Sequence, residues 1–489
     1  MVNDCSLGSM CGGCSFVGSS YEAQLSEKNE HVKKLLTDAG VSEAVYEGIK
    51  ESPLIFGYRN KMEYSFGDCV KNGPLTLGLH QKKSFYNVID VDCCRLVHDD
   101  VNVTVRYAAD FFRKLGITYA DKRSHLGYLR HMLIRRTVNT EELLIDLVTT
   151  SQPLIGVENH SRIYEKTLYD SISADFKDVR PAAEVRSVSL AEALKTGVGA
   201  QQMNAAQQPV SGSAAEETLK EAAQNPQNCV GSGTDAQPDI SAFPCRYDEA
   251  EVLEAFKEGL LDLKKNGIIK GSIAGILHTV NDQLADAVKN DRTDVLYGSE
   301  FITEKMMGLK FSISPFSFFQ TNTRSAEVIY STAGEYISSA LSKDAVLYDL
   351  YSGTGTIAQM LSPYVKKAIG VEIVEEAVEA AGVNAVKNNI KNCEFIAGDV
   401  LKELDNIAEK PDVIVLDPPR EGINPKALRK ILDYGVKRII YISCKPESLA
   451  RDLEMFFGYG YKVERAAAVD QFPWTKHVEC VVLMSRVEK

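Results

Sequence analysis

The sequence predicts an α/β protein whose C-terminal part folds as a doubly wound parallel sheet. From residue 346 onward, apolar strands alternate with helical segments, an order typical of parallel sheets with right-handed crossovers. The expected strands are "VLYDL", "KKAIGVEI", "CEFIAGD", "DVIVLD" and "RIIYIS". Two more strands, in "KVERAAAVDQF" and "VECVVLMS", end the chain and predict a C-terminal hairpin on the same sheet.

Length and composition place this sheet in a larger globular protein. The 489 residues are 44% hydrophobic and 25% charged, and they suffice for two or three domains with their own cores. No stretch approaches the length of a membrane span, and the N-terminus lacks the basic-then-apolar order of a signal peptide. We therefore expect a cytoplasmic protein with no membrane partner, whose eleven cysteines are thiols or metal ligands.

Three segments are expected along the chain: residues 1–100, which are rich in cysteine, a central domain over 101–309, and the parallel sheet over 310–489. Short alternating strands such as "LTLGLHQ", "MLIRRTV" and "ELLIDLVTT" predict an α+β fold for the first two segments. Residues 199–244 are rich in Ala, Gln, Ser, Gly and Pro. We interpret them as a flexible low-complexity insertion, because they have too few large apolar residues to offset their ordering entropy.

Local basic segments indicate contact with nucleic acid despite a net charge of −12. Residues 57–66 ("GYRNKMEYSF") and 121–136 ("DKRSHLGYLRHMLIRR") interleave Lys, Arg or His with Tyr. This mixture suits phosphates and stacked bases. Exposed strands with solvated basic residues have the same pattern, so both interpretations stay open at this point.

A glycine-rich turn predicts a cofactor site at residues 347–361 ("LYDLYSGTGTIAQML"). Gly353 and Gly355 let the backbone pass close to a ligand between a strand and a helix. The turn lacks the third glycine of the dinucleotide fingerprint and the Gly-Lys-Ser/Thr of a P-loop. It resembles the S-adenosylmethionine site of class I methyltransferases.

Two acidic residues at the following strand ends support the same cofactor. Glu372 ends "AIGVEI", where a carboxylate can accept both ribose hydroxyls of an adenosyl group. Asp399 closes "EFIAGD", a position that lies near the adenine in such methyltransferases. An acid at a strand end is also a common helix N-cap, which is the alternative for each residue.

The next two strands end in "DPPR" and in a cysteine. The first resembles the (D/N)PP(Y/F) motif of enzymes that methylate exocyclic amines, but Arg420 stands where those enzymes have an aromatic residue. Cys444 follows "RIIYIS" at the edge of the sheet where α/β enzymes keep reactive groups. A buried free cysteine is usually inert, so Cys444 alone does not define a chemistry.

Methylation at C5 of a pyrimidine requires such a cysteine. The C5 carbon is too weakly nucleophilic until a thiolate has added to C6 of the ring. A base must then remove the C5 proton, and the nucleotide has to be flipped out of its stack. Glu479 in "HVEC" is the candidate base, with a surface glutamate as the alternative.

Taken together, the motifs resemble the RNA uridine-5 (m5U) methyltransferase family. They are "FSFFQTN", "DLYSGTG", "GVE", "LDPPREG", "YISCKPESLARDL" and "FPWTKHVE", in order over residues 310–486, with weaker similarity such as "YLRHMLIRR" further upstream. The resemblance implies that Cys444 is the nucleophile and Glu479 the proton acceptor. It also implies cofactor contacts at Gln320, Tyr351, Glu372 and Asp417, and less closely matched contacts at Thr356 and Asp399.

The resemblance extends these implications to the rest of the site and to the fold. Asp417 is expected to lie close to the target base as well, and Arg420 to be a structural or RNA-facing partner. Residues 310–489 would be the class I S-adenosylmethionine-dependent methyltransferase domain, with a Rossmann-like sheet. An iron–sulfur segment and an RNA-binding domain would precede it.

The N-terminal cysteines suit a metal centre. Cys5, Cys11 and Cys14 form a C-x5-C-x2-C arrangement, and "VDCCRLVH" adds a distant pair. Spacing alone allows a tetrahedral zinc or a [4Fe–4S] cluster. The ribosomal-RNA members of the family carry a [4Fe–4S] cluster with this plan, so the resemblance implies the cluster. It also favours Cys94 over Cys93 as the fourth ligand.

The substrate follows from the same resemblance. The tRNA-directed branch of the family generally lacks these cysteines, which favours 23S ribosomal RNA. Because the first cysteine is residue 5, we do not expect the small β-barrel module with which many cluster-bearing members begin. The alternatives are a tRNA m5U methyltransferase, an RNA cytosine-5 methyltransferase and a non-catalytic iron–sulfur RNA-binding protein. We infer no obligate protein partner.

Overall fold

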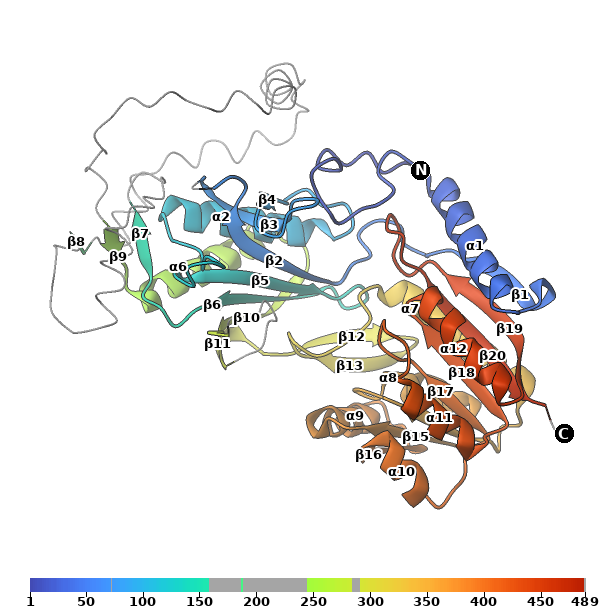
Figure 1. Ribbon diagram of the computed structural model, residues 1–489. Helices are drawn as coiled ribbons and strands as arrows, with labels where there is room; N and C mark the ends of the chain where they lie inside the picture. The colour runs from blue at the N-terminus through green and yellow to red at the C-terminus, as the bar shows by residue number, and fades with distance from the viewer. Residues whose placement is uncertain (72, 158–185, 188–243, 284–290, 488–489) are drawn as a thin grey trace.

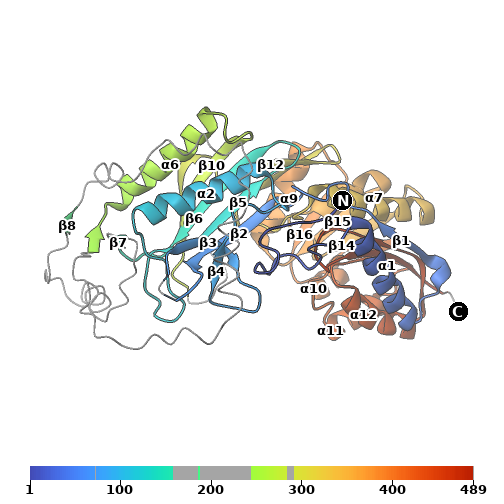
Figure 2. The same cartoon turned by 90° about the horizontal axis from the view of Figure 1, so that it is seen from above.

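The computed structural model describes residues 1–71, 73–157, 186–187, 244–283 and 291–487. The insertion expected over residues 199–244 lies outside the described residues, apart from residue 244. Among the helices that are described, none combines the length and the apolarity needed to cross a bilayer. Figures 1 and 2 show two lobes side by side, each built on its own large sheet.

The C-terminal lobe contains an eight-stranded sheet in the order β1-β19-β20-β18-β17-β14-β15-β16. Strands β14 to β18 pair in parallel, and β20 runs antiparallel to both β18 and β19. This order confirms the predicted doubly wound sheet with its C-terminal pair of strands. The strands are β14 (Val346–Leu350), β15 (Lys367–Glu372), β16 (Cys393–Ala397), β17 (Val413–Leu416), β18 (Arg438–Ser443), β19 (Tyr461–Val469) and β20 (Glu479–Arg486).

Helices cover both faces of this sheet, which explains why its central strands read as continuous apolar runs. One face packs against α1, α10, α11 and α12, and the other against α7 and α8. The helices are α1 (Tyr21–Asp38), α7 (Thr323–Ala340), α8 (Thr356–Leu361), α9 (Glu375–Lys387), α10 (Val400–Asn406), α11 (Pro425–Tyr434) and α12 (Pro446–Gly458).

Helix α1 and strand β1, although they come first in the chain, belong to the C-terminal lobe. Strand β1 (Tyr46–Lys50) pairs in parallel with β19, and Val32 and Leu36 of α1 are buried in the same core as α12. The expected division of the chain at residue 100 is therefore not the division between the two sheets. Residues 1–18, which we call the cysteine segment, run between the two lobes (Figure 1).

The second sheet has seven strands in the order β11-β10-β6-β5-β2-β3-β4. Its strands come from both sides of residue 100, and α2 (Asp99–Lys114) and α6 (Glu249–Lys265) pack on it. They are β2 (Lys61–Asp68), β3 (Leu75–His80), β4 (Val88–Asp90), β5 (Leu129–Arg136), β6 (Glu142–Thr149), β10 (Ser272–Val280) and β11 (Arg292–Gly298). The remaining strands are the hairpin β12 (Ile302–Met306) and β13 (Leu309–Ile313), and the small set β7 (Ile155–Val157), β8 (Arg186–Ser187) and β9 (Pro244–Arg246).

Much of the basic sequence around β5 is structural. Arg135 is only 2% exposed; its Nε donates to the carbonyl of Pro315 at 3.0 Å, and its Nη2 donates to that of Ser317. Arg136 is also buried and donates to Asp100 Oδ2 at 3.1 Å. Within residues 121–136, the exposed cations therefore lie in the turn before β5.

Candidate active site

A cavity of about 860 Å³ lies where the carboxyl ends of β14, β17 and β18 meet the second lobe and the cysteine segment. Strand order reverses between β14 and β17, which is the point where open α/β sheets bind ligands. All the predicted site residues line this cavity except Glu372 and Asp399. Those that line it are Cys5, Cys11, Cys14, Cys94, Gln320, Tyr351, Thr356, Asp417, Cys444 and Glu479.

The turn between β14 and α8, residues 351–355, is built by unusual backbone angles. We call it the cofactor turn. Tyr351, Gly353 and Gly355 all have positive φ, at 67°, 52° and 71°. A Cβ atom at Gly355 would lie 2.4 Å from Phe395 Cε1, so the close approach of β16 requires glycine there.

Glu372 holds the cofactor turn from the end of β15. Its Oε2 accepts from the N–H of Gly353 and its Oε1 from that of Val374, both at 3.0 Å. The neighbouring Ile373 is 68% exposed, an unusual position for a large apolar side chain. A carboxylate beside an exposed apolar group suits the ribose and the base of an adenosyl ligand.

Asp399 is a helix N-cap, which was the alternative interpretation of this residue. It is the N-cap of α10, and its Oδ1 accepts from the N–H groups of Leu401 and Lys402 at 3.0 and 3.2 Å. It still lies near the cofactor turn, because its charge adds to burial in raising the pKa of Tyr351.

Unpartnered polar atoms at the cofactor turn fit a bound ligand. Among the described residues, Ser352 Oγ and Asp349 Oδ1 are buried without a hydrogen-bond partner. The other oxygen of Asp349 accepts from the N–H of Ala358 at 2.9 Å, and burial raises the pKa of this carboxyl to about 8. Sequence analysis missed Asp349 as a site residue, although it is the first residue of the D-x-x-x-G-x-G turn.

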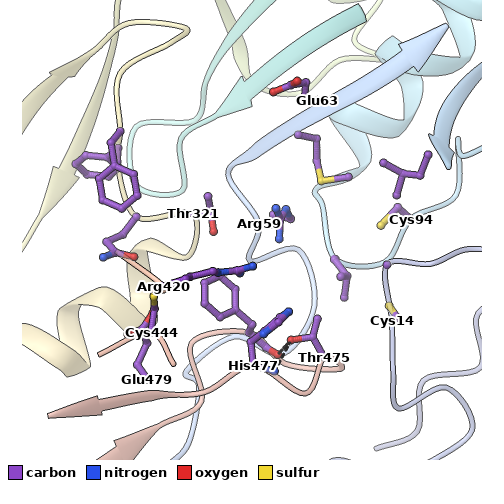
Figure 3. A pocket seen from close by; sticks show the side chains of 18 of the residues that line it. Cys14, Arg59, Glu63, Cys94, Thr321, Arg420, Cys444, Thr475, His477 and Glu479 are labelled. Carbon is purple, nitrogen blue, oxygen red and sulfur yellow. Dashed lines mark hydrogen bonds between the residues drawn. The ribbon is translucent and has the colours of Figure 1, made fainter. Parts of the chain in front are cut away.

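Strand register brings Cys444 and Glu479 together. In the antiparallel pair β18–β20, Ser443 faces Cys480, so the residue after β18 and the first residue of β20 become neighbours. Figure 3 shows both side chains on one side of the cavity, with Arg420 beside them. Glu479 is 3% exposed, so the alternative of a surface glutamate is wrong.

Burial is the main reason why the Cys444 thiol holds its proton when no substrate is bound. Burial, followed by the charges of Glu479 and Asp417, raises the pKa of the Cys444 thiol to about 11, whereas Arg420 opposes this shift. Burial likewise raises the pKa of Glu479 to about 8 and that of Asp417 to about 7. The thiol and the two carboxyl groups can therefore exchange protons with one another when a substrate binds.

Gln320 is presented by the segment that leads into α7. Its carbonyl accepts from Asn60 Nδ2 at 2.8 Å, and its side-chain Oε1 accepts from Gln471 Nε2 at 3.3 Å. Arg59, Phe318 and His477 line the cavity as well. Sequence analysis did not name these three, and Arg59 could have been found as one of the two cations of residues 57–66.

Figure 3 shows Cys14 and Cys94 on the side of the cavity away from Cys444, and Cys5 and Cys11 line the same cavity. Burial raises the pKa of Cys14 to about 12, and the charges of Cys94, Cys11 and Cys5 add to this shift, so the four thiols lie within electrostatic reach of one another. Cys93 is exposed and lies 4.0 Å from Ser6 Oγ. Within the described part of the chain, no three His, Cys, Asp or Glu side chains are arranged to hold a single metal ion.

The loop before Glu479, residues 470–478, is anchored by the first sixty residues. We call it the acceptor loop. Trp474 donates from its N–H to Gln24 Oε1 at 2.7 Å and from Nε1 to the carbonyl of Ile55 at 2.6 Å. Its carbonyl accepts from the N–H groups of Ser15 and Phe16, at 2.8 and 3.1 Å. The acceptor loop is therefore tied directly to the cysteine segment.

A buried ion pair anchors the start of the acceptor loop. Lys28 Nζ of α1 lies 2.5 Å from Asp470 Oδ1, and the same ammonium donates to the carbonyl of Phe472 at 3.1 Å. Both charged side chains are almost fully buried. Burial lowers the pKa of Lys28 and raises that of Asp470, so desolvation outweighs their mutual attraction.

Known proteins resemble this chain throughout its length. A family model described as tRNA (Uracil-5-)-methyltransferase matches residues 289–487. An uncharacterized RNA methyltransferase of Clostridium acetobutylicum is 37% identical over 477 residues, covering 98% of this chain and 82% of the relative. Another, of Caldanaerobacter subterraneus subsp. tengcongensis, is 36% identical and covers 97% of this chain and 83% of its own.

Among solved structures, a tRNA methyltransferase shares the fold over almost the whole chain. The crystal structure of Pyrococcus abyssi tRNA (uracil-54, C5)-methyltransferase in complex with S-adenosyl-L-homocysteine matches 97% of this chain and 86% of its own, with a TM-score of 0.60. Sequence identity to it is 22%, so the likeness is one of fold.

Proposed function

The chain belongs to the RNA uracil-5 methyltransferase family, and from that premise we propose that it methylates C5 of a uridine in 23S ribosomal RNA. One observation carries the proposal: the β18–β20 register sets a thiol beside a buried carboxyl group, next to the cofactor turn. These are the two groups that methylation at a pyrimidine C5 requires.

Cys444 is the proposed nucleophile. Its Sγ forms a bond to C6 of the uracil ring, and the electrons of the C5–C6 double bond make C5 nucleophilic. Because the pKa of the free thiol is about 11, the thiol has to lose its proton when the uridine binds. Arg420, whose charge lowers the pKa of both Cys444 and Glu479, favours the ionised groups.

Glu479 is the proposed proton acceptor. Once C5 has gained its methyl group, the carboxylate removes the remaining C5 proton, the C5–C6 double bond re-forms and the bond from C6 to Sγ breaks. A pKa of about 8 suits a group that first has to lose a proton and then accept one. Asp417, which lies close enough to influence both groups, would face the same base.

S-adenosylmethionine supplies the methyl group. The unpartnered atoms of Asp349 and Ser352 and the positive-φ turn support a site for it. We propose that Glu372 holds the ribose and that Asp399 lies near the adenine. The other contacts would come from Gln320, Tyr351, Thr356 and Asp417, which all line the cavity.

We also propose that Cys5, Cys11, Cys14 and Cys94 hold a [4Fe–4S] cluster. Four thiols that line one cavity are the donor set that such a cluster takes, and zinc is the alternative. Iron and acid-labile sulfide should be measured after anaerobic purification. Cys94→Ser should remove both, and the matched Cys93→Ser should keep them. Zinc in place of iron would contradict this proposal.

Ribosomal RNA is the favoured substrate because the four proposed cluster ligands of this chain resemble the cysteines of the ribosomal branch of the family. A tRNA is the second candidate, since the matching family model and the solved relative are both described as tRNA methyltransferases. Mapping of the methylated nucleotide separates the two.

The covalent step gives the test. The protein should be incubated with methyl donor and cellular RNA that contains 5-fluorouridine, because fluorine at C5 cannot leave as a proton. A denaturation-resistant protein–RNA adduct is expected with wild type and not with Cys444→Ala. The RNA recovered from the adduct identifies the site. No adduct with any RNA, from protein that binds the cofactor, would contradict the proposal.

Glu479→Gln separates the two catalytic roles on normal RNA. The variant should still form the S–C6 bond, but it should release product slowly, so that adduct accumulates without fluorine. Adduct would be measured as protein retained with RNA on a denaturing gel. Release at the wild-type rate would show that another group removes the proton.

A further inference from the structure

An exposed surface on the second lobe combines aromatic rings with cations. The loop between β3 and β4 carries Phe85, which is 85% exposed, and Tyr86, which is 55% exposed. Large aromatic side chains are rarely left so open without a function. Lys82 and Lys83 of the same loop are exposed too.

A second segment, far away in the sequence, completes this surface. Arg123 lies with its Cζ 4.4 Å from the centroid of the Tyr86 ring, and Lys122 Nζ lies 3.3 Å from His80 Nε2. The acidic residue of this turn, Asp121, accepts from the backbone N–H groups of residues 123 and 124, so it shapes the turn. We call the set Lys82, Lys83, Phe85, Tyr86, Lys122 and Arg123 the stacking surface.

The stacking surface adjoins the cavity through the cysteine segment. Gln81 pairs with Cys11, and the N–H of Lys82 donates to the carbonyl of Met10 at 2.7 Å. Cys11 and Leu79 both line the cavity. Leu79 precedes Lys82 by three residues, a span of at most roughly 10 Å of chain.

We propose that the stacking surface binds single-stranded RNA next to the target uridine, with bases stacked on Phe85 and Tyr86 and phosphates paired with the surrounding cations. This inference rests on the proposed function and adds a binding site to it. Four cations on a chain with a net charge of −12 make this surface complementary to a polyanion. Aromatic rings among cations are the combination that binds unstacked nucleotides.

Affinity for RNA tests this site. Full-length protein should be titrated with a labelled single-stranded RNA of mixed sequence, about 20 nucleotides long, at several salt concentrations. The double variant Phe85→Ala/Tyr86→Ala should bind about 10- to 100-fold more weakly, since stacking is lost. Lys82→Ala/Lys83→Ala should reduce the slope of log affinity against log salt by about 1.4.

Matched controls exist on the same chain. Tyr297 is exposed on β11, at the opposite edge of the same sheet, so Tyr297→Ala tests whether any exposed ring matters. Lys387 and Lys391 are exposed beside β16 in the other lobe and serve for Lys387→Ala/Lys391→Ala. Both control variants should keep wild-type affinity and salt dependence. Thermal midpoints of all variants should match wild type, because the substituted side chains are exposed.

A cross-link provides a second measurement that does not depend on affinity. RNA containing 4-thiouridine should cross-link on irradiation to the peptide that contains Phe85 and Tyr86. The proposal is overturned if wild type does not bind the RNA, if the surface variants bind like wild type, or if cross-links avoid this peptide. Failure of the proposed function would appear differently, as the absence of a 5-fluorouridine adduct in wild type.

Discussion

The two sides of the cavity are built in opposite ways. The cofactor turn is held by neighbours in sequence: Glu372 reaches back nineteen residues to Gly353, and Asp349 reaches nine residues forward to Ala358. The acceptor loop is held by residues more than 400 positions away, such as Gln24 and Lys28. The first side is a local motif that can form with its own lobe. The second requires the N-terminal segment to be in place, so the two sides should respond differently to damage.

The largest effect is expected at the ion pair below the acceptor loop. Lys28→Met leaves Asp470 buried without its partner and should lower the free energy of unfolding by about 3–5 kcal/mol. Lys34→Met, on the same helix, breaks only the exposed pair with Asp38 and should cost less than about 0.5 kcal/mol. Denaturant unfolding measures both.

Loss of the ion pair should affect the acceptor loop and leave the cofactor turn intact. Folded Lys28→Met should bind S-adenosylhomocysteine like wild type while its adduct turns over slowly. The double variant Lys28→Met/Asp470→Leu should recover most of the lost stability, because desolvation outweighs the attraction of the pair. Equal losses from Lys28→Met and Lys34→Met would show that the acceptor loop does not depend on α1.

The pH dependence of stability is the next effect in size. Burial raises the pKa of Glu479 to about 8, above its ordinary value of about 4.5, so the folded state binds the proton more tightly. The contribution of Glu479 to stability is therefore fully present below about pH 4.5 and is lost as pH rises through about 8, by up to about 1.4 kcal/mol per pH unit. Glu479→Gln should remove this part of the slope.

Asp349 offers the matched measurement on the cofactor side, since burial raises its pKa to about 8 as well. Asp349→Asn should flatten the same range of pH but should change cofactor affinity, whereas Glu479→Gln should not. Thermal midpoints between pH 5 and pH 8, with calorimetric titration of S-adenosylhomocysteine, distinguish the two variants. If the slope of the thermal midpoint against pH is unchanged in both variants, Asp349 and Glu479 are not the groups that cause it.

A smaller effect is expected at the cofactor turn. Gly355→Ala places a methyl group against Phe395 at a backbone angle that favours glycine, so it should cost about 1–3 kcal/mol and weaken cofactor binding at least about tenfold. Gly382→Ala in α9, where a Cβ meets nothing within 4 Å, should be neutral or stabilising by about 0.5–1 kcal/mol. Equal effects would show that the turn tolerates a side chain.

The smallest effect concerns the bond between the cysteine segment and the acceptor loop. Ser15→Pro removes the N–H that donates to the carbonyl of Trp474 and should cost about 1 kcal/mol, whereas Ser15→Ala keeps it. Trp474 is the sole tryptophan and is fully buried, so its emission should shift to longer wavelength in Ser15→Pro alone. If the two variants have identical emission spectra, the cysteine segment does not support the acceptor loop.

Features formed by residues near one another in the sequence were easier to predict than features formed by residues far apart in it. The strand and turn around Gly353 follow from contiguous residues, and the motif order indicated Cys444 and Glu479. Cys444 and Glu479 lie next to each other because of the register between β18 and β20, and no single motif encodes that register. Burial of Arg135 was not predictable, because its partners are backbone carbonyls 180 or more positions away that any residue could supply.

Strand β1 was missed for a related reason. "YEGIK" is short and weakly apolar, and it gains its place only by pairing in parallel with β19 at the edge of the sheet. The domain limits expected at residues 100 and 309 stay a prediction, although the sheets divide the chain elsewhere. Hydrophobic periodicity reflects only residues that are close in sequence. A short edge strand that pairs with the other end of the chain therefore shows little periodicity of its own.

The pairing of β1 with β19 also has a consequence for how the protein is made. Tyr46 pairs with Ala466, so the first strand to leave the ribosome must wait for nearly the last one before its edge of the sheet can close. Synthesis proceeds at about 5–20 residues per second, which leaves the N-terminal segment without this partner for roughly 20–80 seconds. During that time α1 and the cysteine segment lack their final support, and premature termination of synthesis would leave them exposed to proteolysis.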